Sequence, residues 1–249
     1  MGVTISESFV LPSKGKVYKE KIDPHVELRS MTVEDEMRRL SPSNRPYENM
    51  AKMIEGCLKN KLPIPVYNLC LGDYIYLLHK LRVVTYGPDY HIQFKCPLCG
   101  SVEHTVFDLD SEKILEYDDS IKDLYMVELP KTGHTVRLRL QTPKDLDDIA
   151  IKASEMKKDF PEMKADLTLS LTLKSMIDTI DGNPVDQALI LEQLKGLPMA
   201  DANMISNSAV RLNGKVGVDP VISVHCEHCN NDVNITFPYT NEFYGPTTY

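Results

Sequence analysis

Six cysteines are the residues of this 249-residue chain best suited to chemistry. Four of them form two C-x-x-C pairs, Cys96 with Cys99 and Cys226 with Cys229. A turn that carries C-x-x-C directs two sulfurs to one point, and two such turns facing each other supply the four thiolates of a tetrahedral zinc site. We therefore predict one structural Zn²⁺ bound by Cys96, Cys99, Cys226 and Cys229.

Other uses of the same four cysteines stay open at this point. Disulfides need an oxidising compartment, yet the N-terminus lacks the apolar stretch and cleavage site of a secretion signal. A thioredoxin-like redox motif opens a helix, whereas both pairs here join predicted strands. An iron–sulfur centre would use the same thiolates. Nearby His104, His225 and His228 could replace a cysteine ligand, although we interpret them as solvated or packed side chains.

Both cysteine pairs lie in the same local pattern, which predicts two β-hairpins. Apolar and polar residues alternate over 92–96 and again over 222–226, as in half-buried strands. Gly100 and Asn230 follow the second cysteine of each pair, where a positive φ is often required. The gap of 126 residues between the pairs is far longer than in compact zinc modules. A domain-sized insertion must therefore connect the hairpins, with its ends clamped by the metal.

These patterns predict an α+β fold with split four-cysteine zinc-ribbon β-hairpins, N-terminal helices and a helical insertion between the knuckles. We divide the chain into an extended N-terminal segment (1–30), a helical region (31–90), a first zinc hairpin with further β structure (91–141), the helical insertion (142–215), and a second zinc hairpin with a C-terminal tail (216–249).

Helical periodicity and capping residues predict seven helices outside the hairpins. The first follows an N-cap at Thr32, and the others are expected at Tyr47–Lys59, Leu71–Arg82, Thr142–Lys158, Leu167–Ile180, Asp186–Leu194 and Leu197–Asn213. A further hairpin is expected over 125–140. The two solitary cysteines, Cys57 and Cys70, lie in apolar contexts and are interpreted as small buried hydrophobic residues.

Charge and composition disfavour several classes of partner. Lys and Arg number 28 against 36 Asp and Glu, a net charge of −8, so no basic surface for duplex nucleic acid is expected. Trp is absent and Phe numbers only 6, which argues against a stacking strip for single strands. No run approaches the roughly 20 apolar residues of a membrane span, and none is expected.

The sequence lacks the common signatures of catalysis. It contains no G-x-G-x-x-G after a strand, no Walker loop, no H-E-x-x-H and no G-x-S-x-G. Adjacent acids such as Asp118-Asp119 and Asp147-Asp148 are interpreted as solvated faces rather than as paired catalytic carboxylates. We predict that the protein is not an enzyme.

The order of several motifs resembles the family of T4-type tailed-phage baseplate hub and tail assembly proteins. The match is most specific from Asp73 to Gly100, which includes Tyr86-Gly87-Pro88-Asp89-Tyr90 and Cys96-Pro97-Leu98-Cys99-Gly100. It also covers Leu11–Tyr18, Leu28–Thr32, Cys226–Cys229 and Phe243–Pro246.

The resemblance implies a structural or assembly role in the central part of a contractile-tail baseplate, without catalysis. Other phage tail and baseplate proteins would be its partners, and a homo-oligomer is compatible with this role. The protein would lie in the virion tail baseplate, or in the host cytoplasm during assembly. Two alternatives remain: a zinc-ribbon adaptor of cellular transcription or translation machinery, and an enzyme.

Extended termini often contact neighbours in assemblies, so residues 1–30 and 240–249 are expected to be rich in interfaces. The aromatic tail at 243–246 could serve as a plug in the core or as an exposed peptide for a partner, and we favour the plug.

Overall fold

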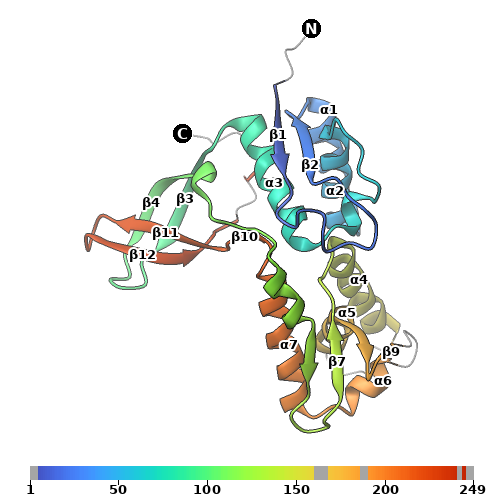
Figure 1. Cartoon of the computed structure of the whole chain (residues 1–249). Coiled ribbons are helices and arrows are strands. Elements are labelled where there is room, and N and C mark those ends of the chain that lie inside the picture. Colours follow the sequence, from blue (N-terminus) through green and yellow to red (C-terminus); the bar gives the residue numbers. More distant parts are fainter. Residues whose placement is uncertain (1–4, 160–167, 186–189, 240–242, 245–249) are drawn as a thin grey trace.

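The computed structural model describes residues 5–159, 168–185, 190–239 and 243–244, which fold around two hydrophobic cores (Figure 1). The first core, in the upper part of the view, joins the N-terminal strands and helices to the two cysteine-bearing hairpins. The second core, in the lower part, lies between a four-stranded antiparallel sheet and the helices packed on it. This combination confirms the predicted α+β class.

The N-terminal part consists of two paired strands and three α-helices. They are β1 (Ser6–Val10), β2 (His25–Arg29), α1 (Val33–Arg39), α2 (Pro46–Cys57), the 3₁₀ turn η1 (Val66–Asn68) and α3 (Leu71–Tyr86). Thr32 caps α1 as predicted, because its hydroxyl accepts the N–H of Asp35 while the Asp35 carboxylate accepts the N–H of Thr32. Helix α3 runs past its predicted end at Arg82 as far as Tyr86, and Gly87, whose φ of 86° favours glycine, follows it.

A buried carboxylate fastens the loop between β1 and β2 to the first turn of α3. Asp73 accepts hydrogen bonds from the backbone N–H of Ser13 at 2.9 Å and from the hydroxyl of Tyr18 at 2.7 Å. Burial raises the pKa of Asp73. Gly15 has a φ of 69°, and a Cβ there would lie 2.3 Å from a carbonyl oxygen across the loop. The motif at 11–18 therefore closes this loop.

Two hairpins carry the paired cysteines, as predicted. Their strands are β3 (Asp89–Lys95), β4 (Val102–Asp108), β11 (Val221–Cys226) and β12 (Asn231–Thr236). Strand β3 pairs with β4 and β11 with β12, both antiparallel. Every second residue of β3 and β11 is buried, which places Tyr90, Ile92 and Phe94 from one hairpin with Ile222 and Val224 from the other in the first core.

The connections to the lower part of the molecule lie side by side. After the 3₁₀ turn η2 (Leu109–Ser111), strand β5 (Ile114–Leu115) pairs antiparallel with β10 (Gly217–Val218). Strand β10 also lies against the start of α3, where a Cβ on Gly72 would approach the carbonyl oxygen of Val216 to 2.0 Å. Only glycine at position 72 permits this contact, which fixes the position of the segment entering β10 against the first turn of α3.

The lower part contains the remaining elements. They are η3 (Asp119–Leu124), β6 (Met126–Glu128), β7 (Thr135–Leu138), α4 (Pro143–Asp159), α5 (Thr168–Met176), β8 (Ile177–Ile180), β9 (Asn183–Pro184), α6 (Ile190–Lys195) and α7 (Met199–Asn213). The sheet has the order β6-β7-β8-β9. The two helices predicted at Thr142–Lys158 and Leu197–Asn213 are confirmed as α4 and α7. Residues 167 and 186–189 of two other predicted helices lie outside the described residues.

The helix predicted at Leu167–Ile180 is wrong over its last four residues, Ile177–Ile180. Helix α5 ends at Met176, and β8 follows at once and pairs antiparallel with β7. Residues Ile177, Thr179 and Ile180 are β-branched, which favours a strand once a partner strand is available. The insertion is therefore mixed in structure rather than purely helical.

The interpretation of Asp147 as a solvated residue is also wrong. Asp147 lies on α4 and is only 1% exposed. Its carboxylate accepts the N–H of Glu48 at 3.0 Å, the N–H of Tyr47 at 3.4 Å and the hydroxyl of Tyr67 at 2.9 Å. These amides belong to the first turn of α2, so a residue of α4, about 100 positions later in the chain, supplies the N-terminal acceptor that α2 lacks locally.

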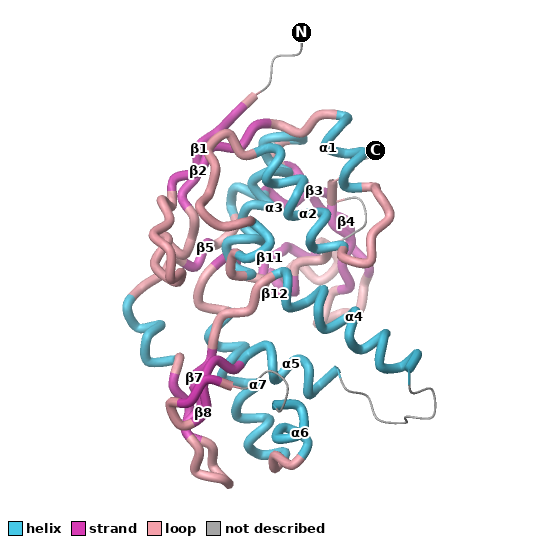
Figure 2. The backbone as a smooth tube through the Cα atoms, turned by 90° about the vertical axis from the view of Figure 1, so that its right-hand side faces the viewer, coloured by secondary structure: helices cyan, strands magenta, loops and turns pink. Residues whose placement is uncertain are grey.

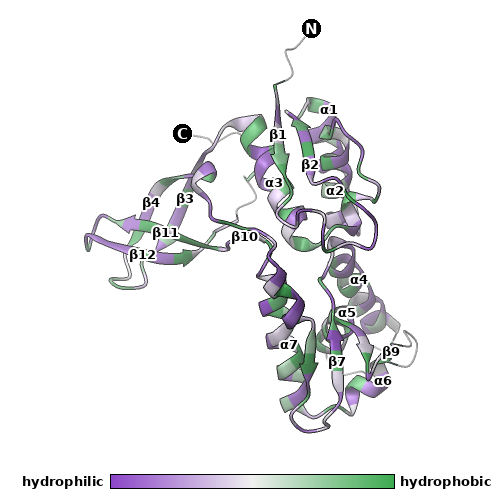
Figure 3. Ribbon diagram, viewed as in Figure 1, coloured by the Kyte–Doolittle hydropathy of each residue, from purple (hydrophilic) through white to green (hydrophobic). Residues whose placement is uncertain are grey.

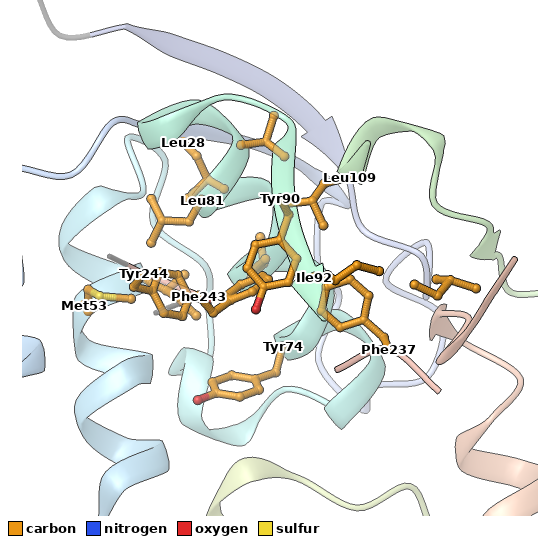
Figure 4. Close-up of a cluster of buried hydrophobic side chains, with 14 of the residues drawn as sticks. Leu28, Met53, Tyr74, Leu81, Tyr90, Ile92, Leu109, Phe237, Phe243 and Tyr244 are labelled. Atoms are coloured by element: carbon orange, nitrogen blue, oxygen red, sulfur yellow. The ribbon is translucent and has the colours of Figure 1, made fainter. Parts of the chain in front are cut away.

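Phe243 and Tyr244 of the aromatic tail pack into the first core (Figure 4). Phe243 and Tyr244 are 4% and 6% exposed, and the ring of Phe243 lies 5.2 Å from that of Tyr90 and 6.0 Å from that of Phe237. The plug interpretation is confirmed for these two residues.

A second view, turned by 90°, places α2 and α3 above the helices and strands of the lower part (Figure 2). Hydrophobic and hydrophilic residues alternate along α7, as expected for a helix with one face on the second core (Figure 3). Within the described residues, no helix has the length and apolar character required to cross a membrane.

Candidate metal centre

The two C-x-x-C turns have closely similar local structure. In the first, the N–H of Gly100 donates to the carbonyl of Cys96 at 2.9 Å. Gly100 has a φ of 77° and Asn230, at the equivalent place in the second turn, has a φ of 54°. The predicted positive φ angles are confirmed at both positions.

The four sulfurs converge on one point. The Sγ atoms of Cys96, Cys99, Cys226 and Cys229 all lie within 4.8 Å of one another. The sulfurs of Cys96 and Cys229 are 3.9 Å apart, and those of Cys99 and Cys226 are 3.7 Å apart. Tetrahedral Zn²⁺ with bonds of about 2.3 Å holds its sulfurs about 3.8 Å from each other, so the four thiols fit this ion.

The sulfur separations also bear on the disulfide alternative. A disulfide bond requires the two sulfurs to lie about 2.05 Å apart, and all six cysteines are free thiols in this structure.

Cys57 and Cys70 are buried, which confirms their interpretation as small core residues. Burial raises the pKa of each of these two thiols to about 12, so neither is a reactive thiolate at neutral pH.

A serine hydroxyl lies between cysteines of the two hairpins. Ser101 Oγ is 3.0 Å from the Sγ of Cys99 and 3.5 Å from that of Cys226. Hydrogen bonding from Ser101 lowers the pKa of Cys99 to about 6 and also lowers the pKa of Cys226. Asn231 lowers the pKa of Cys229, but burial and the neighbouring thiols outweigh it and raise that pKa to about 11. Metals bind thiolates rather than thiols, so the lowered pKa values of Cys99 and Cys226 favour metal binding at this site.

Histidines do not enter the sulfur group within the described residues. The ring of His225 instead contacts Asp232 Oδ1 at 2.8 Å and Asn230 Oδ1 at 3.2 Å. His104 and His228 are exposed. The described donor set therefore consists of sulfur alone, which suits zinc better than calcium or magnesium because those ions prefer oxygen.

A buried polar chain near the tail was not predicted from the sequence. His79 on α3 contacts Glu112 Oε1 through Nδ1 and the hydroxyl of Tyr239 through Nε2, both at 2.7 Å. The side chains of His79 and Glu112 are each 1% exposed. The three residues are separated by 33 and 127 positions and form no motif, so no local signal could have brought them together. Their arrangement ties the C-terminal tail to α3.

Comparison with known proteins identifies a family. A family model described as T4 bacteriophage base plate protein matches residues 4–245, which includes both hairpins and the insertion between them. No curated protein and no solved structure matches the chain.

Proposed function

Since the chain belongs to the family of T4 bacteriophage base plate proteins, we propose that it is a non-enzymatic structural or assembly component of the hub region of a contractile-tail baseplate. The observation that carries this proposal is the extent of the match, 4–245 of 249 residues. The family implies other phage tail proteins as partners and the virion tail as the location. The hub position and the absence of catalysis are parts of the proposal.

The proposal includes a structural zinc ion held by Cys96, Cys99, Cys226 and Cys229. It is supported by sulfur separations that match a tetrahedral site and by the all-sulfur donor set. Four protein ligands leave no open coordination position, so the ion would stabilise structure rather than activate a substrate. It would hold the two ends of the 100–225 segment together, in line with the proposed division of the chain into five regions.

The surfaces available for assembly include the N-terminal strand. Ile5, just before β1, and Val10, its last residue, are 58% and 47% exposed, although Phe9 of the same strand packs on the first core. Within the C-terminal region, Phe243 and Tyr244 are buried. We therefore propose that the N-terminal strand, rather than the aromatic tail, contributes to contacts with neighbours.

Fractionation of a phage-infected lysate tests the proposed role. Mature particles, free baseplates and soluble protein are separated by density and probed for this chain. A fixed copy number in mature particles supports a structural subunit, and presence only in intermediates supports an assembly factor. Absence from every phage-derived fraction contradicts both roles and would favour a zinc-ribbon adaptor.

A further inference from the structure

A groove at the junction of the two cores is lined by an excess of basic side chains. It has a volume of about 720 Å³, with the loop at 16–19 on one side and residues of η3, β6 and β7 on the other. The charged residues lining it are five cations, Lys16, Lys19, Lys122, Arg137 and Arg139, and a single acid, Asp178. Acidic residues outnumber basic ones 36 to 28 in the whole chain, so the charge of the groove lining is opposite in sign to the net charge of the molecule.

Neighbouring carboxylates neutralise part of this charge. Three of the cations have ion-pair partners: Lys122 with Asp119 at 2.8 Å, Arg139 with Asp145 at 2.6 Å and Arg137 with Asp178 at 3.5 Å. Lys16 and Lys19 are exposed, and neither has an ion pair within the described part of the chain. The ammonium of Lys16 instead lies 5.4 Å from the centre of the Tyr117 ring. These two lysines are free to meet carboxylates from outside.

The floor of the groove is apolar and aromatic. Val17, Leu138 and Leu140 line it together with Tyr117 and Tyr125. A small inorganic anion would leave these side chains uncovered, and the net charge of −8 opposes the approach of a nucleic acid. An extended peptide that carries both carboxylates and apolar side chains matches the rim and the floor together.

We propose that this groove binds an acidic, extended segment of another baseplate protein, with Lys16 and Lys19 contacting its carboxylates. The identity of the partner as a baseplate protein rests on the proposed function, whereas the chemistry of the segment rests on the groove itself. The two lysines select acidic segments and the apolar floor retains them.

The test uses the full-length, metal-loaded protein and a short fluorescein-labelled peptide in which aspartate alternates with leucine and serine. Binding is followed by fluorescence anisotropy at low salt, and a peptide with lysine in place of aspartate serves as the charge control. The variant is Lys16→Glu/Lys19→Glu. Its matched control is Lys61→Glu/Lys144→Glu, which changes the net charge equally at two exposed lysines outside the groove.

We expect the groove variant to bind the acidic peptide about tenfold more weakly, and the control variant to bind it as the native protein does. Lys16→Gln/Lys19→Gln, which introduces no new charge, should show an intermediate loss. The proposal is overturned if the native protein does not prefer the acidic peptide, or if both Glu variants lose affinity equally. Self-association of the native protein at low salt that the groove variant loses and the control variant keeps would likewise contradict it, because the groove would then hold a second copy.

Assembly separates this proposal from the proposed function. Infected cells that supply the groove variant in place of the native chain should yield fewer complete tails, whereas the control variant should support normal yields. If the native chain is absent from all tail fractions, the proposed function fails whatever the peptide binds. If both variants assemble normally and the peptide does not bind, only the groove proposal fails.

Discussion

At the scale of single residues, the cysteine cluster depends on side chains that contribute no sulfur. Ser101 Oγ reaches a thiol from each hairpin, and Gly100 and Asn230 adopt a positive φ directly after the second cysteine of each turn. The chemistry of the site is therefore distributed over both turns, and each cysteine contributes to closing the same tetrahedron.

Replacing one of these cysteines tests the metal directly. The native protein should bind about one zinc per chain, and Cys96→Ser should weaken zinc binding at least tenfold because three thiolates remain. Metal content is measured by mass spectrometry after dialysis. Cys57→Ser is the matched control, since Cys57 is buried outside the cluster and its variant should keep the metal. Iron with visible absorption, or equal loss from both variants, would contradict a zinc site at these positions.

Asp147 illustrates a residue whose role depends on distant partners. Asp147→Ala removes the acceptor for two amides of α2 and the Tyr67 hydroxyl, so we expect a loss of about 2 kcal/mol in the free energy of unfolding. Asp148→Ala, which removes a half-exposed pair with Arg45, should cost less than about 1 kcal/mol. Urea denaturation of both variants checks the order, and equal losses would contradict the capping role.

At this scale, the sequence predicts a contact when its residues follow a local pattern, and fails when the partners lie far apart along the chain. The sulfur cluster could be foreseen because two-residue spacing and strand alternation are local patterns that both hairpins repeat. Asp147 could not, because its amide partners lie about 100 positions away and nothing near it in sequence indicates burial. The contacts among His79, Glu112 and Tyr239 escaped prediction for the same reason.

At the scale of elements, local sequence determines where helices begin better than where they end. The cap at Thr32 and the Pro at the start of α4 were foreseen from adjacent residues. The change from α5 to β8 was not, because the mixed apolar and polar pattern of 173–180 suits a helix or a strand. The partner strand β7 lies about 40 positions earlier and decides between them.

Helix α1 should make stability depend on pH through its cap. Burial alone would raise the pKa of Asp35, but hydrogen bonds from Arg29 and Thr32 outweigh it and lower that pKa to about 2. A carboxyl group with a lowered pKa stabilises the fold above its unfolded pKa near 4, and this contribution is lost as the pH falls towards 2.

We expect Asp35 to contribute about 2 kcal/mol to the free energy of unfolding at pH 7. Denaturation curves at pH 7 and pH 3 should therefore differ less for Asp35→Asn than for the native protein. An unchanged difference between the two pH values would show that Asp35 does not carry this dependence.

The close contact between α3 and the chain entering β10 should require glycine at position 72. Gly72→Ala would place a Cβ 2.0 Å from a backbone oxygen, which must force the two elements apart. We expect a loss of more than about 3 kcal/mol in unfolding free energy, or failure to fold. Gly196→Ala is the control, because its nearest neighbour would lie at 3.7 Å. Similar stability of the two variants would contradict the close approach.

At the scale of the whole molecule, the two cores are joined in different ways. The hydrogen bonds that Asp147 of α4 accepts from α2, and the pairing of β5 with β10, join the upper and lower parts of the molecule through the protein itself. The proposed zinc links only elements of the first core. Metal removal should therefore affect the molecule unevenly. Chelation would free the hairpins from each other but leave the contacts between β7 and β8 intact.

Hydrogen exchange on the native and chelated protein measures this difference. After chelation, amide protection should fall in the hairpins, at 89–108 and 221–236, because the thiolates that close them repel one another without an ion. Protection in α7 should change little, since its buried residues belong to the second core. Uniform loss would mean that the chain unfolds as one unit, and no change in the hairpins would mean that the cysteines do not depend on metal. Restoring zinc should recover protection in the hairpins if the effect arises from the ion.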